Sequence, residues 1–305
     1  MHHHHHGHDH HHHAPNAADI VRSTFIIGIV LNMLYVITEV IAGLMTNSMA
    51  LLSDAGHNLG DVAGLALSLF SFKLAKVKPT NTYTYGYKKT TILAALANAV
   101  ILLIGIGVIG YESIVRLKHP EPVQGGVIAW IAALGILVNA GSALLFFRNK
   151  NEMNNKAAYV HLMSDAVVSV AVVIAGIIIK YTHLYWIDAA ISIVVLLVIL
   201  YSTWSLLKDS LRLTMDAVPE SVDIDTIRAL IENTEGVSDV HHMHIWAMST
   251  TENALTTHLV LNDILSFEEK MEVVHHLKHE LQHNNIQHAT IELESGATPC
   301  ENEDC

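Results

Sequence analysis

Six stretches of apolar residues, each long enough to cross a lipid bilayer, occupy the first two thirds of the sequence. A helix needs about 20 apolar residues to span the hydrocarbon core. The stretches cover residues 22–45, 49–74, 90–116, 123–147, 157–180 and 186–207. Charged residues make up only 15% of the chain, against roughly 25% in ordinary soluble domains. We therefore expect an α-helical membrane domain of six transmembrane helices over residues 20–208.

Lysine and arginine are unevenly divided between the two sides of these predicted spans. The side that includes both chain ends holds most of them, whereas the opposite side holds Arg116, Lys118 and Lys180. Cytoplasmic loops carry the excess of these residues, and six spans place both ends of the chain on one side. The sequence therefore predicts that both termini are cytoplasmic.

The pattern changes after Asp209 to that of a small α+β domain over residues 209–296. A helix is expected at 221–233, and strands are expected at 237–248, 254–261 and 286–294. Ser266 and Glu269 form a capping box ahead of a second helix. The apolar stripe of that helix consists of Met271, Val274, Leu277 and Leu281. The order αββαβ favours a compact sheet with helices on one face.

The two ends of the chain differ from these domains in composition. Residues 1–19 form a His-rich tail, expected to be disordered and cytoplasmic, with histidines at His2–His6, His8 and His10–His13. An expression tag is one interpretation, but the interruptions at Gly7 and Asp9 favour a native metal-collecting arm. Residues 297–305 form a tail that holds both cysteines, Cys300 and Cys305, so no disulfide framework is expected. The formal net charge of −12 lies mostly after residue 208 and disfavours nucleic-acid binding.

Two histidine–aspartate pairs with the same spacing lie inside predicted spans. The second span contains His57 and Asp61, and the fifth contains His161 and Asp165. Spacing of i and i+4 places both side chains of a pair on one helix face. Ionisable groups within a bilayer are costly and are functional candidates by default.

Together the two pairs supply two imidazoles and two carboxylates, the tetrahedral N/O ligand set that Zn²⁺ prefers. For a single pair, a structural hydrogen bond is the commoner explanation. Two copies at identical spacing favour a shared metal site, and the lack of thiolate partners disfavours a soft metal such as Cu(I). Metal binding needs neutral histidine and ionised aspartate, so metal and protons compete, and we hypothesise that the site exchanges one for the other.

Longer motifs around these pairs are similar to those of the cation diffusion facilitator family, in its bacterial zinc-exporter branch. They are Asn47–His57, Tyr85–Tyr87, His161–Asp165, His241–Trp246 and His288–Glu294. The resemblance covers nearly the whole chain after the histidine tract. It implies six spans, a metallochaperone-like cytoplasmic domain, a homodimer in the bacterial cell (inner) membrane, and proton-coupled efflux of divalent metal by alternating access.

The resemblance also assigns residues to sites. The transport site of the family falls on His57, Asp61, His161 and Asp165, and His at position 57 resembles members that favour zinc over cadmium. A cytoplasmic, regulatory zinc site falls on His241, His258 and Glu294. Zn²⁺ is then the transported substrate and a regulatory ligand, and no cofactor is expected. The loop Ala75–Lys89 has no His, Asp or Glu, so the extra loop site of some relatives is expected to be missing.

Other polar residues carry weaker signals. Strand alternation predicts that His241 shares a face with Met243 and Ile245, opposite His242, so that these histidines cannot all serve one ion. His275, His276, His279 and His283 are expected on a solvated helix face.

Several polar residues in or beside the spans have roles that the sequence leaves open. Asn32, Glu39 and Asn139 either line the cation path or hydrogen-bond between helices. Asp54 is a candidate for orienting the site, and Asp188 is expected to be solvated at the membrane interface.

Two functions of other classes fit this sequence less well. A hydrolytic zinc enzyme normally has three protein ligands and an open water position, but the four-ligand set leaves no such position and no His-Glu-x-x-His motif is present. A metal sensor needs a module that receives the signal, and neither a catalytic nor a DNA-binding module is recognisable. The sequence therefore predicts a zinc/proton antiporter and not an enzyme.

Overall fold

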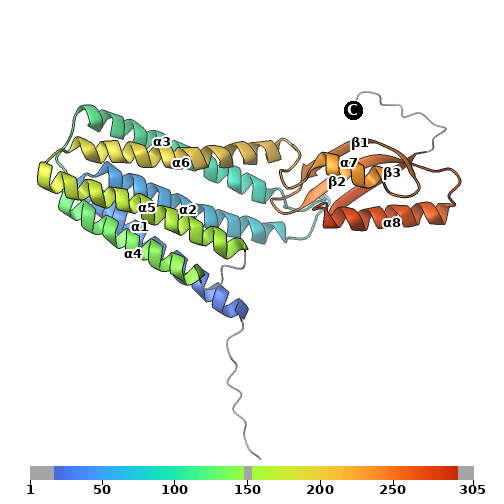
Figure 1. Cartoon of the computed structure of the whole chain (residues 1–305), viewed down its shortest axis with the longest axis horizontal. Coiled ribbons are helices and arrows are strands. Elements are labelled where there is room, and N and C mark those ends of the chain that lie inside the picture. The colour runs from blue at the N-terminus through green and yellow to red at the C-terminus, as the bar shows by residue number, and fades with distance from the viewer. Residues whose placement is uncertain (1–16, 148–152, 295–305) are drawn as a thin grey trace, which may run out of the picture. The chain divides into compact units, whose positions relative to one another are not determined.

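The computed structural model describes residues 17–147 and 153–294 (Figure 1). These residues form two compact units. One unit contains the described residues up to 62 together with 107–197, and the other contains 63–106 together with those from 198 onward. Several long helices run through both units. The division predicted from the sequence, into a tail (1–19), a membrane domain (20–208), a cytoplasmic domain (209–296) and a second tail (297–305), stays a prediction.

Six long helices lie at the positions of the six predicted spans. They are α1 (Ala17–Thr46), α2 (Met49–Ala75), α3 (Thr90–Lys118), α4 (Gly125–Phe147), α5 (Met153–Thr182) and α6 (Trp186–Thr214). Within the described residues, α3, most of α4 and α5, and α6 are long and apolar enough to cross a membrane. In α1, the described apolar stretch Val30–Thr46 is shorter than these four spans. Helix α2 is more polar because Asp54, His57 and Asp61 lie within it.

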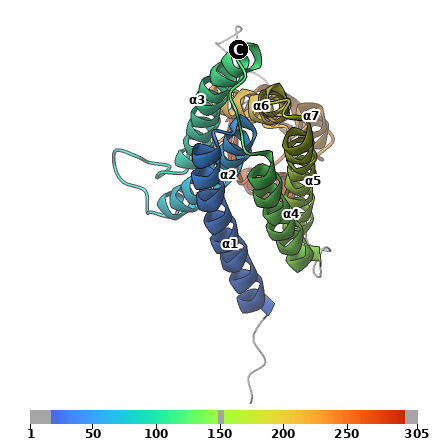
Figure 2. The same cartoon turned by 90° about the vertical axis from the view of Figure 1, so that its left-hand side faces the viewer.

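Helix α4 packs along α5 and also against α1 (Figure 2). The α4–α5 contact brings the two backbones together at Gly125 and Gly176. A Cβ atom on Gly125 would lie 2.5 Å from the carbonyl oxygen of Gly176, and one on Gly176 would lie 2.7 Å from the amide nitrogen of Ala129. Small residues permit such close helix contacts in membranes, so any larger side chain at either glycine would force α4 and α5 apart.

Asp188, in the first turn of α6, is 3% exposed, so the prediction that it is solvated is wrong. Its carboxylate accepts hydrogen bonds from the Ser48 hydroxyl at 2.5 Å and from the Met49 backbone amide at 2.6 Å. A helix N-terminus has unpaired amide groups and a positive dipole end. Asp188 therefore caps the start of α2 from a neighbouring helix, which compensates its burial.

Replacing Asp188 by Ala should destabilise the helical unit. The change removes the acceptor for the Ser48 hydroxyl and for the first amides of α2 in a buried place, at a cost of about 1–3 kcal/mol. We expect a lower thermal unfolding midpoint in detergent for Asp188→Ala, with partial recovery in Asp188→Asn. The control is Asp209→Ala on the same helix, where the carboxylate accepts an exposed bond from Ser205. Equal midpoints for Asp188→Ala and the control would contradict the capping role.

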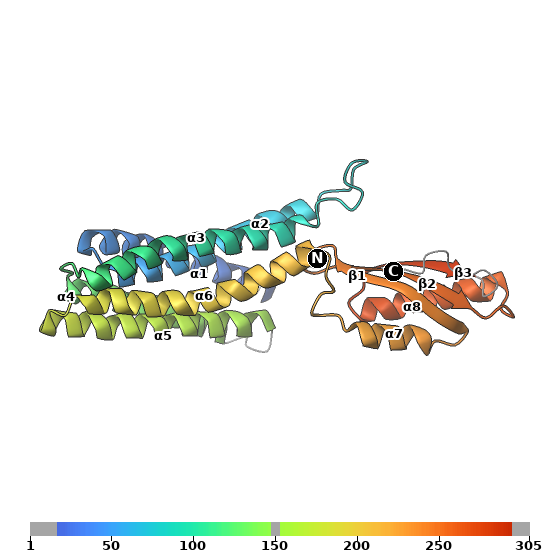
Figure 3. The same cartoon turned by 90° about the horizontal axis from the view of Figure 1, so that it is seen from above.

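The C-terminal part is a three-stranded sheet with two helices on one face, as predicted (Figure 3). Its elements are α7 (Ile224–Glu232), β1 (Val237–Ala247), β2 (Asn253–Leu261), α8 (Phe267–His283) and β3 (His288–Glu294). The strand order is β1-β2-β3, with β1 antiparallel and β3 parallel to the central β2. The predicted capping box of Ser266 and Glu269 begins α8.

The core of this domain forms between the sheet and the two helices. Ile227 and Ile231 of α7 are buried in it, as are Leu277 and Leu281 of α8. Met271, by contrast, is 44% exposed, so its predicted place in the apolar stripe is wrong. It lies in the second turn of α8, and the buried part of the helix begins only at Val274.

Strand β1 contains a β-bulge. The pairs that flank it are His241 with His258, and His244 with Thr256. Two residues of β1, His242 and Met243, therefore face the single residue Thr257 of β2. His242 has a φ of 48°, in the left-handed region that non-glycine residues adopt only rarely.

The extra residue shifts the alternation of side chains along β1. Met243 and Ile245 are buried in the core, whereas His241 lies on the other face with the polar groups. The prediction that these three residues share one face is therefore wrong. A bulge adds one residue to one strand, and a strict period of two does not include it.

Candidate metal centres

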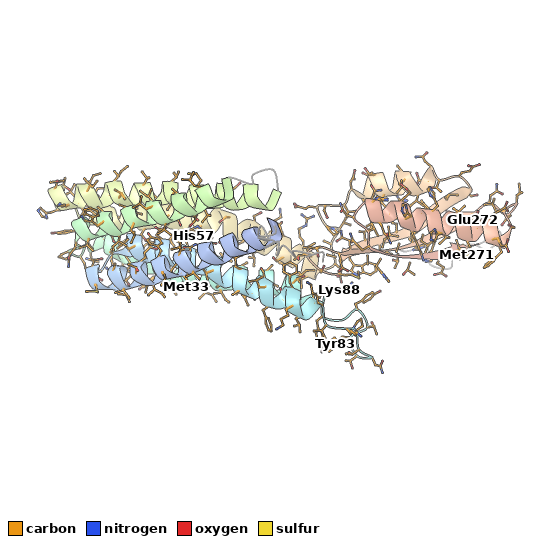
Figure 4. All side chains as sticks on the ribbon, turned by 90° about the horizontal axis from the view of Figure 1, so that it is seen from below. Met33, His57, Tyr83, Lys88, Met271 and Glu272 are labelled. Atoms are coloured by element: carbon orange, nitrogen blue, oxygen red, sulfur yellow. The ribbon has the colours of Figure 1, made fainter. Side chains whose placement is uncertain are left out.

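His57, Asp61 and Asp165 form the first group of metal-ligating side chains (Figure 4 labels His57). The Nε2 atom of His57 lies 3.3 Å from Oδ1 of Asp165, and its Nδ1 atom lies 3.7 Å from Oδ2 of Asp61. One ligand atom from each residue lies within 4.8 Å of the other two. The structure therefore brings the pair on α2 next to the aspartate of the pair on α5.

The environment of this group is suited to a cation. The Asp165 side chain is 3% exposed, and those of His57 and Asp61 are 15% and 25% exposed. Two ligands of one tetrahedral zinc ion, each about 2.05 Å from the metal, are about 3.3 Å apart. The distance between His57 and Asp165 has this value. The fourth predicted ligand, His161, belongs to α5 one turn before Asp165, but its side chain lies outside the described residues.

Two further buried carboxylates lie beside this group. Asp54 accepts a hydrogen bond from the Ser169 hydroxyl of α5 at 3.3 Å. Glu39 accepts one from Tyr35 at 2.9 Å and one from the Asn58 amide of α2 at 3.5 Å. Asp54 thus links α2 to α5, and Glu39 links α1 to α2, so both help to fix the backbone that carries the ligands.

Asn32 and Asn139, unlike Glu39, have buried side-chain atoms without a hydrogen-bond partner among the described residues. The side chain of Asn139 is fully buried, and within the described residues its amide has no hydrogen-bond partner. The Asn32 amide oxygen is likewise without one. For these atoms, the described part of the chain provides no support for an interhelical hydrogen bond.

His241, His258 and Glu294 form the second group, in the C-terminal domain. Glu294 bridges the two histidines, with one carboxylate oxygen 3.0 Å from His241 Nε2 and the other 2.6 Å from His258 Nδ1. His241, His258 and Glu294 belong to β1, β2 and β3 in turn. His241 pairs directly with His258, and Glu294 pairs with Val260, two positions further along β2. Among the described residues, only these two groups bring three or more ligating side chains so close.

Two acidic residues beside this second group were not identified from the sequence. Asp239 lies 2.9 Å from His241 Nδ1, and Glu292 lies 3.6 Å from His258 Nε2. A carboxylate on the far nitrogen fixes the tautomer and orients the other nitrogen toward a metal. Each lies two positions before a ligand on the same strand, a spacing that a search of strand faces would have detected.

The pKa of Glu294 favours its ionised form, which is the form that binds a metal. Desolvation raises its pKa, but the hydrogen bonds from His258 and His241 and the charges on these rings outweigh that effect. The pKa of Glu294 therefore lies below its ordinary value. The carboxyl group is ionised at neutral pH and ready to bind a cation.

The histidines of α8 lie where the sequence predicted them. His275, His276, His279 and His283 of α8 are all exposed, so the prediction of a solvated face is confirmed. The histidine tract at His2–His13, and Cys300 and Cys305, lie outside the described residues.

The segment between α2 and α3 contacts the C-terminal domain. Lys88 forms an ion pair with Glu252, and Lys89 lies 2.6 Å from a carboxylate oxygen of Asp216 (Figure 4 labels Lys88). The ring of Tyr85 packs edge-on against His288. The sequence showed only that this segment lacks metal ligands. Its contacts with the C-terminal domain were not predicted.

Comparison with known proteins agrees with this architecture. Residues 25–215 match the cation efflux transmembrane domain, and residues 219–296 match the cytoplasmic domain of cation efflux proteins. The cadmium, cobalt and zinc/H(+)-K(+) antiporter of Bacillus subtilis (strain 168) is 39% identical over 267 residues, which are 86% of each chain. Zinc transporter ZitB of Escherichia coli (strain K12) is 35% identical, covering 89% of this chain and 86% of its own.

A solved structure, the metal-bound C-terminal domain of the CzcD transporter from Cupriavidus metallidurans, is 36% identical. The alignment covers 24% of this chain and 99% of the solved chain, with a TM-score of 0.22.

A set of apolar helices followed by an αββαβ domain, with both parts matched to cation efflux proteins, defines a multi-pass membrane transporter of divalent cations with a cytoplasmic C-terminal domain. It is not an enzyme. The chain belongs to the cation diffusion facilitator family, as its motifs predicted.

Proposed function

We propose that this transporter exports Zn²⁺ from the cytoplasm of a bacterial cell in exchange for protons. The metal binds between α2 and α5 at His57, Asp61, His161 and Asp165. The observation that carries the proposal is the meeting of three of these side chains from two helices, with donor atoms within 4.8 Å. With His161 added, the site has two nitrogen and two oxygen donors, which suits Zn²⁺ in tetrahedral geometry.

The same arrangement explains how protons would compete with the metal. The ring of His57 lies between Asp61 and Asp165, with one nitrogen toward each carboxylate. A protonated imidazole donates from both nitrogens, so this position suits the imidazolium as well as the metal-bound ring. Binding of Zn²⁺ displaces the proton, and protonation from the other side of the membrane releases Zn²⁺.

The matched family description, cation efflux, supports the direction, and the names of the relatives support the cargo and the counter-ion. One is named as an antiporter of cadmium, cobalt and zinc with H⁺ and K⁺, and another as a zinc transporter. We place the chain in the inner membrane with both termini cytoplasmic, because lysine and arginine gather on that side. Movement of helix pairs around a fixed site would expose it alternately to the two sides.

The C-terminal domain has a regulatory role in this proposal. Zn²⁺ binds at His241, His258 and Glu294 when its cytoplasmic concentration rises, and two copies of the chain form a homodimer through this domain. The histidine tract at the N-terminus acts as a metal-collecting arm.

Zinc uptake into proteoliposomes under an imposed pH gradient tests the exchange. With the lumen more acidic than the medium, Zn²⁺ uptake should rise at least several-fold over vesicles without a gradient, because luminal protons displace the metal. The ionophore nigericin, which removes the gradient in the presence of K⁺, should return the rate to the basal value. Uptake that is the same with and without the gradient would contradict proton exchange, and no uptake of any divalent metal would contradict the assignment of the cargo.

A further inference from the structure

Three imidazole rings, not two, meet on the outer face of the sheet. The ring centroids of His241 and His258 are 5.6 Å apart, those of His241 and His242 are 5.3 Å apart, and those of His242 and His258 are 5.0 Å apart. The bulge in β1 is the reason, because it gives His242 a positive φ beside His241. Strict alternation would have turned His242 to the opposite face.

These separations fit three rings on a single ion. With a Zn–N distance of about 2.05 Å, the centroid of a bound imidazole lies about 3.2 Å from the metal. Two such rings at the tetrahedral angle have centroids about 5.2 Å apart. All three measured separations are within about half an ångström of that value.

We propose that His242 is a ligand of the metal bound by His241, His258 and Glu294, which gives this site three nitrogen donors and one oxygen donor from the protein. The inference rests on the proposed metal site of the C-terminal domain and adds a residue to it. His242 does not belong to the group whose donor atoms lie within 4.8 Å. It reaches the metal by turning its ring about the side-chain bonds.

The backbone of His242 explains how its ring comes to lie beside the other two. A positive φ is uncommon for a residue other than glycine, although histidine adopts it more often than most. Here the bulge in β1 imposes it. The ring of His242 therefore lies on the same face as those of His241 and His258, where it can bind the same ion.

Four protein ligands would make this a closed site. Structural zinc sites have four protein ligands, whereas catalytic sites keep an open position for water. The competing candidate for the fourth position is a water molecule, because Glu292 lies on the far nitrogen of His258, 3.6 Å from Nε2. A closed site holds Zn²⁺ without reacting, which suits a regulatory role.

The experiment uses the full chain in detergent, without residues 2–13 and with Cys300→Ser and Cys305→Ser. Asp61→Ala and Asp165→Ala remove the transport site, so that the C-terminal site is measured alone. Two variants, His242→Gly and His242→Asn, remove the imidazole and tolerate the positive φ. The matched control is His244→Ala, an exposed histidine of the same strand, and His241→Ala is the reference for loss of the site.

Zn²⁺ affinity is measured by competition with a chromogenic chelator, and the visible absorption of bound Co²⁺ reports the ligand set. We expect both His242 variants to lose at least about tenfold in affinity, since loss of even an indirect partner of a metal ligand costs 10–100-fold. Their Co²⁺ absorption should change as water replaces nitrogen, while His244→Ala matches the parent.

Each contrary outcome has a distinct meaning. If His241→Ala removes the bound metal but both His242 variants keep the affinity and spectrum of the parent, the role of His242 is wrong and the three-residue site stands. If His241→Ala changes nothing, the proposed site itself is wrong, and the inference with it. An equal loss in His244→Ala would also overturn the inference, because damage to the strand would then explain the effect.

Discussion

Zinc transport should fall by more than about 100-fold in Asp165→Asn, because the change removes one of the ligands around which α2 and α5 meet. Asparagine keeps the size of the side chain and removes its charge. The Asp165 side chain is 3% exposed and lies against His57, so water cannot easily replace the missing carboxylate. The measurement is the initial rate of Zn²⁺ uptake into proteoliposomes at equal protein content.

A carboxylate elsewhere in the membrane helices provides the control. Glu112 of α3 pairs with Arg116 at 2.9 Å, and Glu112→Gln should keep most of the transport rate. If Asp165→Asn takes up Zn²⁺ as fast as Glu112→Gln does, Asp165 is not a ligand of the transported ion. Asp61→Asn should resemble Asp165→Asn, because it removes another carboxylate of the same group of proposed ligands.

Replacing His57 by Asp should change which metal is carried. The substitution exchanges a nitrogen donor for an oxygen donor and adds a negative charge at the centre of the site. Ligand type and geometry decide selectivity among divalent ions, and the change removes an imidazole that suits Zn²⁺. We therefore expect the ratio of Cd²⁺ to Zn²⁺ uptake to rise by about tenfold or more. Parallel uptake of the two metals at one pH and concentration measures this ratio.

His57→Ala is the comparison that separates selectivity from general loss. Alanine removes the donor without replacing it, and both metals should then be transported poorly. An unchanged uptake ratio in His57→Asp, with a normal rate, would show that His57 does not set the preference for zinc.

The sequence predicted the parts of this protein that depend on local pattern. Long apolar runs define helices whatever their neighbours are, and i, i+4 spacing places His57 and Asp61 on one face. The β-strands and the capping box at Ser266 follow from equally short-range signals. Which helices meet does not follow from such signals, so the approach of α5 to α2 rested on matching the two motifs.

The errors arose where a long-range partner or an irregular backbone decides the outcome. Nothing near Asp188 in sequence shows that its carboxylate accepts hydrogen bonds from the first amides of α2. The Met49 amide lies 139 residues earlier in the chain. The bulge at His242 is equally hidden, because a positive φ is uncommon at any residue other than glycine and the strict alternation of a strand does not indicate it. For Met271, the apolar stripe was correct in spacing but extended one turn beyond the part of α8 that packs on the sheet.

The contact of α4 with α5 at Gly125 and Gly176 limits how the transport site can open. Backbones in direct contact have no intervening side chains whose rotation could absorb a sliding motion. We therefore expect α4 and α5 to move together, with Asp165 on the moving pair. A motion that separates Asp165 from His57 would then displace both helices from α2, so a single bulky side chain at either glycine would disturb transport from a distance without touching the metal.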